Sequence, residues 1–246
     1  MTARILEFDR VSAAYPGGSP ALRNVSFTIR DANARTAVLG GNGAGKSSLF
    51  LALGGFLKFD GAIHVEGKLL TMASIEQIRR SIGFVFENAD DQFFLETLFD
   101  DIAFGPRNAG VAESDITNRV REALAAVGLE GCESRHPRKL SLGERRLASI
   151  ATVLSMRPRI LIFDEPTANL DLRARRRVLT TIRNFNGAVI VLTHDLAAAR
   201  EITNEAVVLS EGCVVFTGTT TDVFRHPAAR AALSIDAEES MIEKLF

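Results

Sequence analysis

The chain has 246 residues, of which 46% are hydrophobic, and its 29 Lys and Arg residues nearly balance its 30 Asp and Glu residues. This length fits one large globular domain, or a core with a subdomain, and the hydrophobic content suits an α/β protein. A net charge of −1 gives no global field favouring nucleic acid or an anionic membrane, so we expect no nucleic-acid partner. The two cysteines, Cys132 and Cys213, lie far apart without metal-ligand spacing, which predicts reduced thiols in a cytosolic protein.

The first residues carry Glu7 and Asp9 and no long apolar stretch, so we expect no signal peptide. No apolar run approaches the ~20 residues that a membrane-spanning helix needs. If the protein works at a membrane, we expect another chain to hold it at the cytoplasmic face as a peripheral subunit.

Three early segments alternate apolar and polar residues and predict half-exposed antiparallel strands, at residues 4–10, 25–30 and 63–69. A turn at residues 15–18 separates the first two segments. Tyr15 in this turn is the only tyrosine of the chain. It either stacks on a nucleotide base, which is worth about 1–3 kcal/mol, or packs as a loop residue on the small sheet.

The segment GGNGAGKS, residues 40–47, follows the apolar run 36–39 and precedes a helix-like segment at 48–53. A buried strand, a glycine loop and a helix form the context in which this pattern cradles phosphate, because the loop N–H groups and the helix N-terminus attract an anion. We expect Lys46 to reach the β- and γ-phosphates and the Ser47 hydroxyl to bind Mg²⁺. The expected nucleotide contacts of this segment are Gly40, Gly41, Asn42, Gly43, Ala44, Gly45, Lys46, Ser47 and Ser48.

Four further apolar runs, together with residues 36–39, predict strands that are covered on both faces, as in a parallel sheet. Helical patterns separate most of these runs, which indicates an α/β core. Residues 88–157 differ, because they carry helical patterns such as 114–127 and no convincing strand. We therefore predict a single domain with a core at 1–87 and 158–226, a helical subdomain at 88–157 and a tail at 227–246. The four runs are 83–86, 160–163, 189–192 and 207–209.

Two of the apolar runs end in residues that suit phosphate chemistry. Asp164 and Glu165 follow the run 160–163, where Asp164 is placed to bind Mg²⁺ and Glu165 to accept a proton from an attacking water. The alternative is an ordinary surface turn closed by Pro166. His194 follows the run 189–192 and is suited to contact a γ-phosphate, although a lone His there is often structural.

Ser141 and Glu144 open a helical stretch that runs to about residue 156, and their spacing fits a capping box. A capped helix N-terminus is also an anion site. Two distant helix starts of one compact chain cannot easily hold one phosphate, but two chains can hold it between them.

Together these motifs resemble the ATP-binding cassette (ABC) ATPases in order and spacing, across essentially the whole chain. The resemblance implies a P-loop core with a mainly parallel sheet, an antiparallel β subdomain and an inserted helical subdomain. It also implies a head-to-tail dimer with two ATP molecules at the interface. Tyr15 would then stack on adenine, Glu165 would be the general base, His194 would sense the γ-phosphate, and Asp171 would signal across the interface. The partner subunit's ATP would meet Ser141, Leu142, Gly143, Glu144 and Asp171.

Three residues depart from the family pattern. Leu142 and Glu144 replace the usual Gly and Gln of the Ser-Gly-Gly-Gln turn, while Ser141 and Gly143 remain. Glu87 stands where the family has a Gln that contacts Mg²⁺ and water. A carboxylate still suits Mg²⁺, but it adds negative charge near the γ-phosphate.

The segments 88–94 and 101–106 resemble the ATPases of energy-coupling factor (ECF) transporters, especially the cobalt/nickel branch. That resemblance implies ATP-driven uptake of a cobalt or nickel ion, or of a vitamin such as biotin. A membrane scaffold subunit would dock near residues 87–104, and a small membrane subunit would capture the substrate. An alternative is the ATPase of a solute-binding-protein-dependent importer. A chromosome-structuring ABC ATPase is disfavoured, because residues 46–164 leave no room for a long coiled coil.

The residues near the expected docking segment allow two interpretations. Apolar side chains there would line the scaffold groove, or they would belong to the core of the helical subdomain. A basic cluster at Arg173 and residues 175–177 is typical of a solvated helix face. The apolar candidates are Phe93, Phe94, Leu95, Leu98, Phe99 and Phe104.

Overall fold

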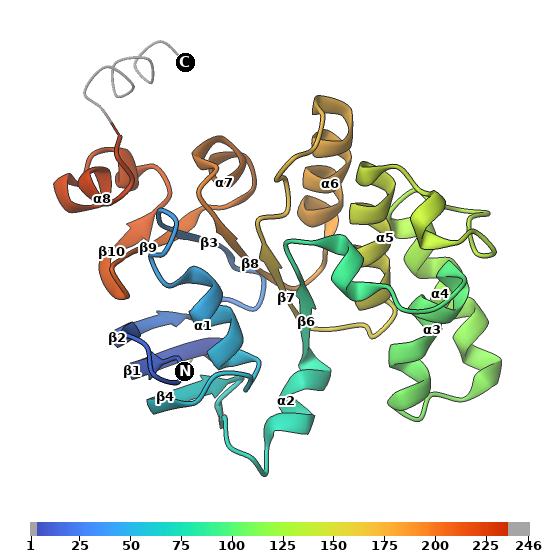
Figure 1. The fold of residues 1–246 in the computed structure, drawn as a ribbon, viewed down its shortest axis with the longest axis horizontal. Coiled ribbons are helices and arrows are strands. Elements are labelled where there is room, and N and C mark those ends of the chain that lie inside the picture. Colours follow the sequence, from blue (N-terminus) through green and yellow to red (C-terminus); the bar gives the residue numbers. More distant parts are fainter. Residues whose placement is uncertain (1–3, 236–246) are drawn as a thin grey trace. The chain divides into compact units, whose positions relative to one another are not determined.

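The computed structural model describes residues 4–235, and these form two compact units. One unit joins residues 4–79 to residues 188–235, and the other contains residues 80–187. Figure 1 labels most of the helices and strands of both units. Of the predicted tail at 227–246, the part beyond residue 235 lies outside the described residues. The predicted domain boundaries at 88 and 157 stay a prediction.

The first unit contains a four-stranded antiparallel sheet in the order β2-β1-β4-β5. The alternating sequence of β1 buries every other side chain over much of its length, and Phe8 stacks on Phe27 with ring centroids 4.7 Å apart. The predicted segment 63–69 is interrupted at Glu66 and Gly67, whose φ angles of 50° and 76° suit a tight hairpin turn. The strands are β1 (Leu6–Ala14), β2 (Pro20–Ile29), β4 (Phe59–Val65) and β5 (Lys68–Leu69).

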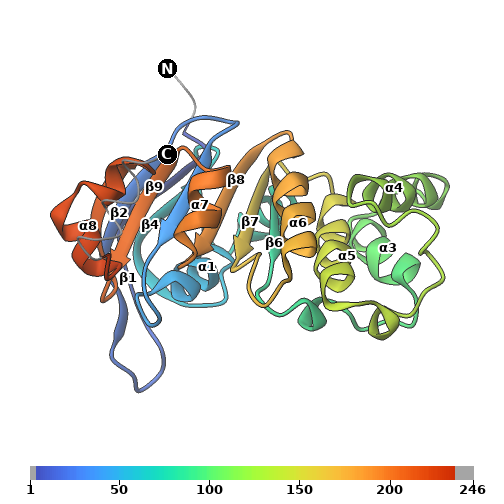
Figure 2. The same ribbon diagram turned by 90° about the horizontal axis from the view of Figure 1, so that it is seen from above.

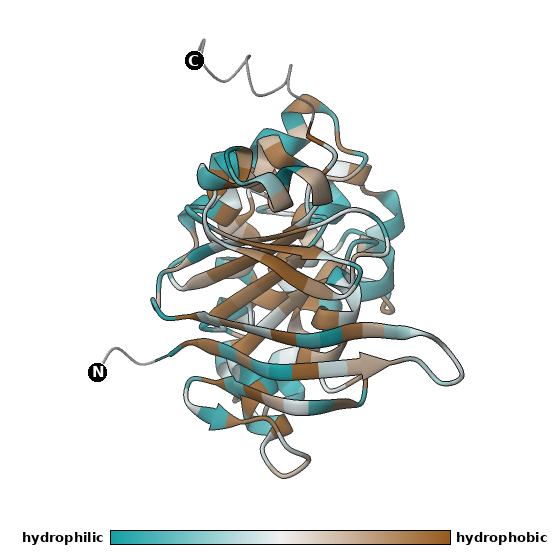
Figure 3. Ribbon diagram, turned by 90° about the vertical axis from the view of Figure 1, so that its left-hand side faces the viewer, coloured by the Kyte–Doolittle hydropathy of each residue, from teal (hydrophilic) through white to brown (hydrophobic). Residues whose placement is uncertain are grey.

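A second set of strands in this unit has the order β10-β9-β3-β8. β3 pairs in parallel with both β8 and β9, as the continuous apolar runs predicted, while β10 is antiparallel to β9. Figure 3 shows the hydrophobic colouring of strands in this region. β10 escaped prediction because its side chains are half-buried or exposed and form no continuous buried run. The strands are β3 (Arg35–Leu39), β8 (Ala188–Thr193), β9 (Glu205–Ser210) and β10 (Cys213–Thr219).

Helices cover these strands. α7 packs on β3 and β8, and α8 packs on β9 and β10 (Figure 2). A buried cluster that includes Leu39, Val208 and Val223 joins them, so apolar burial fixes the strand that leads into the glycine loop. α2 carries the chain out of this unit. The helices are α1 (Lys46–Leu53), α2 (Ile75–Ser81), α7 (Leu196–Ile202) and α8 (Pro227–Ala232), with a 3₁₀ turn at Asp222–Phe224.

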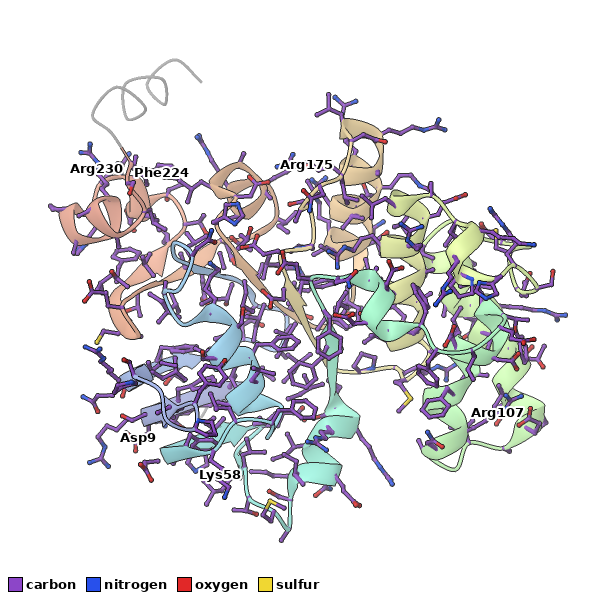
Figure 4. The ribbon with its side chains drawn as sticks, in the orientation of Figure 1. Asp9, Lys58, Arg107, Arg175, Phe224 and Arg230 are labelled. Atoms are coloured by element: carbon purple, nitrogen blue, oxygen red, sulfur yellow. The ribbon has the colours of Figure 1, made fainter. Side chains whose placement is uncertain are left out.

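The second unit pairs β6 (Ile82–Val85) with β7 (Ile160–Asp164) in parallel and places α5 against β6. Residues 88–157 contain helices and turns without a strand, as predicted. Arg107, which Figure 4 labels, lies in the last turn of α3. Its Nη2 donates to Oε1 of Glu113 at the start of α4 (2.7 Å). The helices are α3 (Leu98–Asn108), α4 (Glu113–Ala126), α5 (Leu142–Leu154) and α6 (Leu172–Asn184), with 3₁₀ turns at Ala89–Gln92 and Pro137–Lys139. Among the helices described for residues 4–235, none has the length and apolar character needed to cross a bilayer.

Candidate nucleotide-binding and catalytic residues

The glycine loop at residues 40–45 connects β3 to α1 and leaves the start of α1 open to an anion. Gly45 caps α1 without any side-chain hydrogen bond, so the first N–H groups of the helix receive no side-chain acceptor at that position. The Lys46 ammonium donates to the carbonyl oxygens of Gly40 (2.7 Å) and Gly41 (3.2 Å). Lys46 is buried, with 7% of its surface exposed, and so it is held inside the curl of the loop.

The backbone of this loop requires glycine at two positions, 45 and 40. Gly45 has a φ of 106°, and a Cβ there would lie 2.8 Å from the carbonyl oxygen of Ala21. At Gly40 a Cβ would lie 2.7 Å from the carbonyl oxygen of Leu209. The loop is therefore packed tightly on its protein side. A Cβ at Gly41 would meet no atom within 4 Å, so the loop keeps an open side.

Tyr15 lies beside the start of α1. The Gly18 N–H donates to the Tyr15 carbonyl (3.0 Å), which forms the predicted turn, and the Tyr15 hydroxyl lies 3.2 Å from the Ser48 hydroxyl. The ring is 43% exposed, so it retains a surface for stacking. The unit thus brings together two of the residues predicted to contact nucleotide.

His194 leaves the same strand edge as the glycine loop. Leu39, the last residue of β3, is paired with Thr193, the last residue of β8, in a parallel register. The next residues, Gly40 and His194, therefore both follow the carboxyl ends of adjacent parallel strands, where open α/β sheets bind ligands. His194 is exposed at this edge.

The second unit repeats this arrangement with the predicted carboxylates. Val85 pairs with Phe163 at the ends of β6 and β7, so the chain segments containing Glu87 and Asp164 leave one edge together. Asp164 and Glu165 are 9% and 8% exposed, whereas Glu87 is exposed. Glu165 has a φ of 44°, a left-handed conformation that costs a non-glycine residue about 1–2 kcal/mol.

The predicted capping box is present at the start of α5. The Ser141 hydroxyl accepts from the Glu144 N–H (3.3 Å), and the Glu144 carboxylate accepts from the Ser141 N–H (2.8 Å). This bond from the Ser141 backbone, together with the Arg135 guanidinium at 3.4 Å, lowers the pKa of Glu144. Glu144 therefore completes the capping box, a role that either Glu or Gln can fill at this position.

The Ser141–Glu144 turn faces the segment 169–177 across a groove of about 510 Å³. Asp171 caps α6 by accepting from the Ala174 N–H (2.8 Å). A Cβ on Gly143 would lie 2.5 Å from the Cβ of Ala174, so only glycine fits where the turn meets α6. Leu142 projects into solvent with 46% of its surface exposed. The residues predicted to meet the partner's ATP are thus gathered on one face of this unit.

The aromatic residues of the predicted docking segment divide between surface and core. Phe94 is 60% exposed and Phe104 is 43% exposed, and their rings meet edge to face at 4.6 Å. Leu98 is fully buried and belongs to the core. Phe93, Phe94 and Leu95 line a cavity of about 510 Å³ with polar neighbours that include Arg138.

The sequence reasoning missed two side chains that hold the Phe86–Glu87 segment to α5. The Gln92 amide accepts from the Phe86 N–H (3.1 Å) and donates to the Ser149 carbonyl (3.2 Å). Arg146 donates to the carbonyl of Phe86. The available signal was a charged residue on the buried stripe of α5, since position 146 is four residues before Ile150 on the same helix face.

The fold and these motifs agree with known proteins. The model of the ABC transporter family matches residues 22–168. The chain belongs to the ABC transporter family. An energy-coupling factor transporter ATP-binding protein of Carboxydothermus hydrogenoformans is 42% identical over 87% of this chain and 80% of its own length. One from Methanospirillum hungatei is 38% identical over 94% of this chain and 85% of its own.

A solved structure confirms the ABC ATPase fold that the sequence predicted. The cbiO1 protein of Clostridium perfringens, described as part of the ABC transporter complex cbiONQ, has a TM-score of 0.83 and 30% identity. The match covers 98% of this chain and 99% of that protein. This ABC protein is therefore an ATPase coupled to transport.

Proposed function

We propose that this ABC ATPase energises micronutrient uptake through an ECF-type membrane transporter, with a cobalt or nickel ion as first candidate and a vitamin such as biotin as second. The relatives named as energy-coupling factor ATP-binding proteins support the transporter class, and the cbiONQ membership of the cbiO1 structure supports the metal branch. The observation that carries the ATPase role is the glycine loop, in which the Lys46 ammonium bonds to the Gly40 carbonyl and no side chain caps the start of α1.

In this proposal, Tyr15 stacks on the adenine, and the N–H groups of residues 40–48 with the Lys46 ammonium hold the phosphates. Glu165 accepts a proton from water as the water oxygen bonds to the γ-phosphorus. The bond from that phosphorus to the β,γ-bridging oxygen breaks, which yields ADP and phosphate. His194 contacts the γ-phosphate and orders the water.

The oxygen donors of the chain suit Mg²⁺. Ser47 offers a hydroxyl, while Asp164 and Glu87 offer carboxylates, and Mg²⁺ prefers few protein oxygens supplemented by phosphate and water. In residues 4–235 no three or more His, Cys, Asp or Glu side chains form a cluster that could hold a metal ion by themselves. When bound, the ion would neutralise charge on the phosphates.

We further propose that two ATPase subunits, identical or similar, close around two ATP molecules. The groove formed by Ser141–Glu144 and the start of α6 would meet the ATP of the partner subunit. Its support is the exposed serine at an α5 N-terminus, where N–H groups attract an anion, together with Gly143 and Asp171 beside it.

The membrane partners follow from the same assignment. A scaffold subunit would dock on the surface near residues 87–104, where the exposed Phe94–Phe104 pair offers an apolar contact. A small membrane subunit would capture the substrate without direct contact. The ATPase would then lie on the cytoplasmic face of the membrane, held there by these partners.

ATP turnover by purified full-length variants tests the catalytic assignment. We expect Lys46→Ala and Glu165→Gln to abolish phosphate release, because the first loses the phosphate contact and the second loses the general base. Lys58→Ala, at an exposed lysine of the same unit, provides the control and should keep wild-type turnover. Turnover retained by Lys46→Ala would contradict the assignment of the phosphate loop.

Co-purification with the neighbouring membrane subunits tests the transporter class. An ECF ATPase should bring down a scaffold membrane subunit and no solute-binding protein, whereas recovery of a solute-binding protein would favour the importer alternative. Phe94→Asp should reduce scaffold recovery. The matched control is Phe56→Asp, since Phe56 is 61% exposed in the other unit and Phe94 is 60% exposed.

A further inference from the structure

Arg146 lies on the buried side of α5, and only 3% of its surface is exposed. A buried guanidinium is tolerated when acceptors surround it. Its Nη1 donates to the carbonyl of Phe86, and its Nη2 donates to the carbonyls of Glu87 and Glu165, the last at 3.3 Å. One side chain therefore joins three backbone oxygens from two segments that are distant in sequence.

These two segments carry carboxylates assigned to the reaction. β6 and β7 end side by side, so Glu87 and Glu165 lie just beyond the same strand edge. Glu165 adopts a left-handed backbone with a φ of 44°, a conformation that persists only where the surroundings hold it. The bond from Arg146 to the Glu165 carbonyl is one such restraint, and it acts on the backbone that aims the Glu165 side chain.

The charge of Arg146 also matters. Burial lowers the pKa of its guanidinium, and the negative charges of Glu87 and Asp164 act in the opposite direction. An arginine side chain stays protonated in such a setting. Because Arg146 donates to the Glu87 carbonyl, a fixed positive charge stands at the segment that carries the Glu87 carboxylate, whose negative charge would otherwise be unbalanced near the phosphates.

We propose that Arg146 is a positioning residue for ATP hydrolysis, which fixes the Glu165 backbone and the Glu87 segment through direct bonds to their carbonyls and balances the charge of Glu87. The inference rests on the proposed roles of Glu165 and Glu87. It adds a connection between the helix that begins at Ser141 and the segments that carry these two carboxylates.

The first test compares Arg146→Met with Arg119→Met in the full-length protein. Arg119 donates to the Ser155 carbonyl (3.4 Å) just beyond the far end of α5, so its replacement removes an arginine–carbonyl bond away from residues 87 and 165. We expect Arg146→Met to lower kcat by at least about tenfold, with KM for ATP within about twofold. We expect Arg119→Met to keep kcat within about twofold of wild type.

A charge rescue separates positioning from general destabilisation. Glu87→Gln removes a negative charge near the γ-phosphate, and its own turnover is measured as the reference for the double variant. The double variant Arg146→Met with Glu87→Gln should have a kcat at least about threefold higher than Arg146→Met alone. This gain would be a non-additive effect and would express the coupling of the two side chains. Arg146→Lys keeps the charge without the planar fork, so Glu87→Gln should bring it no such recovery.

Hydrogen exchange supplies a readout that does not depend on turnover. Peptides spanning residues 86–92 and 164–168 should exchange faster in Arg146→Met than in wild type or Arg119→Met. If Arg146→Met does not fold, as judged by thermal unfolding, the same comparison is made with Arg146→Lys, for which we expect a kcat between wild type and one tenth of it.

Three outcomes would overturn the inference. They are a kcat of Arg146→Met within about twofold of wild type, unchanged exchange at both peptides, or strict additivity with Glu87→Gln. Glu165→Gln is measured in the same assay. If it abolishes turnover while Arg146→Met does not lower it, the proposed function stands and the role of Arg146 falls. If Glu165→Gln retains turnover, the assignment of the general base fails instead.

Discussion

At the scale of single residues, Asp101 is the clearest case of a side chain whose environment changes its chemistry. It is 4% exposed, and its Oδ1 accepts from the N–H groups of Phe94 (3.1 Å) and Leu95 (3.2 Å). Its Oδ2 is buried and has no hydrogen-bond partner within residues 4–235. Burial raises the pKa of Asp101 above its ordinary value, and the two N–H bonds partly oppose that rise.

A raised pKa means that the fold favours the neutral acid. The contribution of Asp101 to wild-type stability should therefore fall as pH rises from about 3.8, the unfolded value, through the higher folded-state pKa. Asp101→Asn keeps an acceptor for Phe94 and Leu95 but cannot ionise. We expect the free energy of unfolding of this variant, relative to wild type, to increase with pH across that window, as measured by urea unfolding at a series of pH values.

The same substitution at the exposed Asp115 controls for the loss of one carboxylate. A constant difference between Asp101→Asn and wild type from acidic to neutral pH would show that burial of Asp101 does not affect its ionisation. Because Asp101 accepts a hydrogen bond from the Phe94 N–H, the experiment also shows how Asp101 affects the segment that carries the proposed docking surface.

At the scale of elements, the sequence predicts best what depends on neighbouring residues. The capping box of Ser141 and Glu144 lies within four positions, and the structure confirms it with both hydrogen bonds. Continuous apolar runs likewise predict β3, β7, β8 and β9, since strands buried on both faces leave that pattern. β10 leaves no such pattern, because its pairing with β9 is antiparallel and its side chains are not fully buried.

Contacts between distant segments are what the sequence conceals. In the sequence, Arg146 cannot be told from other basic residues of a helix. Its hydrogen bonds form only because the ends of β6 and β7 lie near α5. The need for glycine at residue 143 also depends on a contact with a distant segment. The resemblance to a family identifies the position, but the reason is the Cβ of Ala174 at 2.5 Å, which belongs to another helix.

At the scale of the whole molecule, the proposed function pairs the ATP site of one subunit with a surface of a second subunit. One face of the unit at residues 80–187 presents Ser141, Leu142 and the start of α6 around a groove. Leu142 and Leu172 are 46% and 74% exposed, although apolar side chains of this size are usually buried. Such exposure near an anion-binding helix start suits a surface that another subunit covers when ATP is bound.

The proposed dimer should be trapped by a variant that binds ATP without hydrolysing it. With Glu165→Gln, ATP binds and is not hydrolysed, so the closed state should accumulate and the mass measured by light scattering after sizing should double. Adding Ser141→Arg should keep the protein monomeric, because a long cation then occupies the phosphate-facing turn.

Ser141→Arg also removes the cap of α5, which costs about 1 kcal/mol of stability. Leu142→Arg leaves this cap intact and should block dimerisation equally. Ser114→Arg, at an exposed position of α4, should leave the dimer unchanged. All of these variants should still bind a fluorescent ATP analogue, and dimers of Leu142→Arg would contradict the proposed interface.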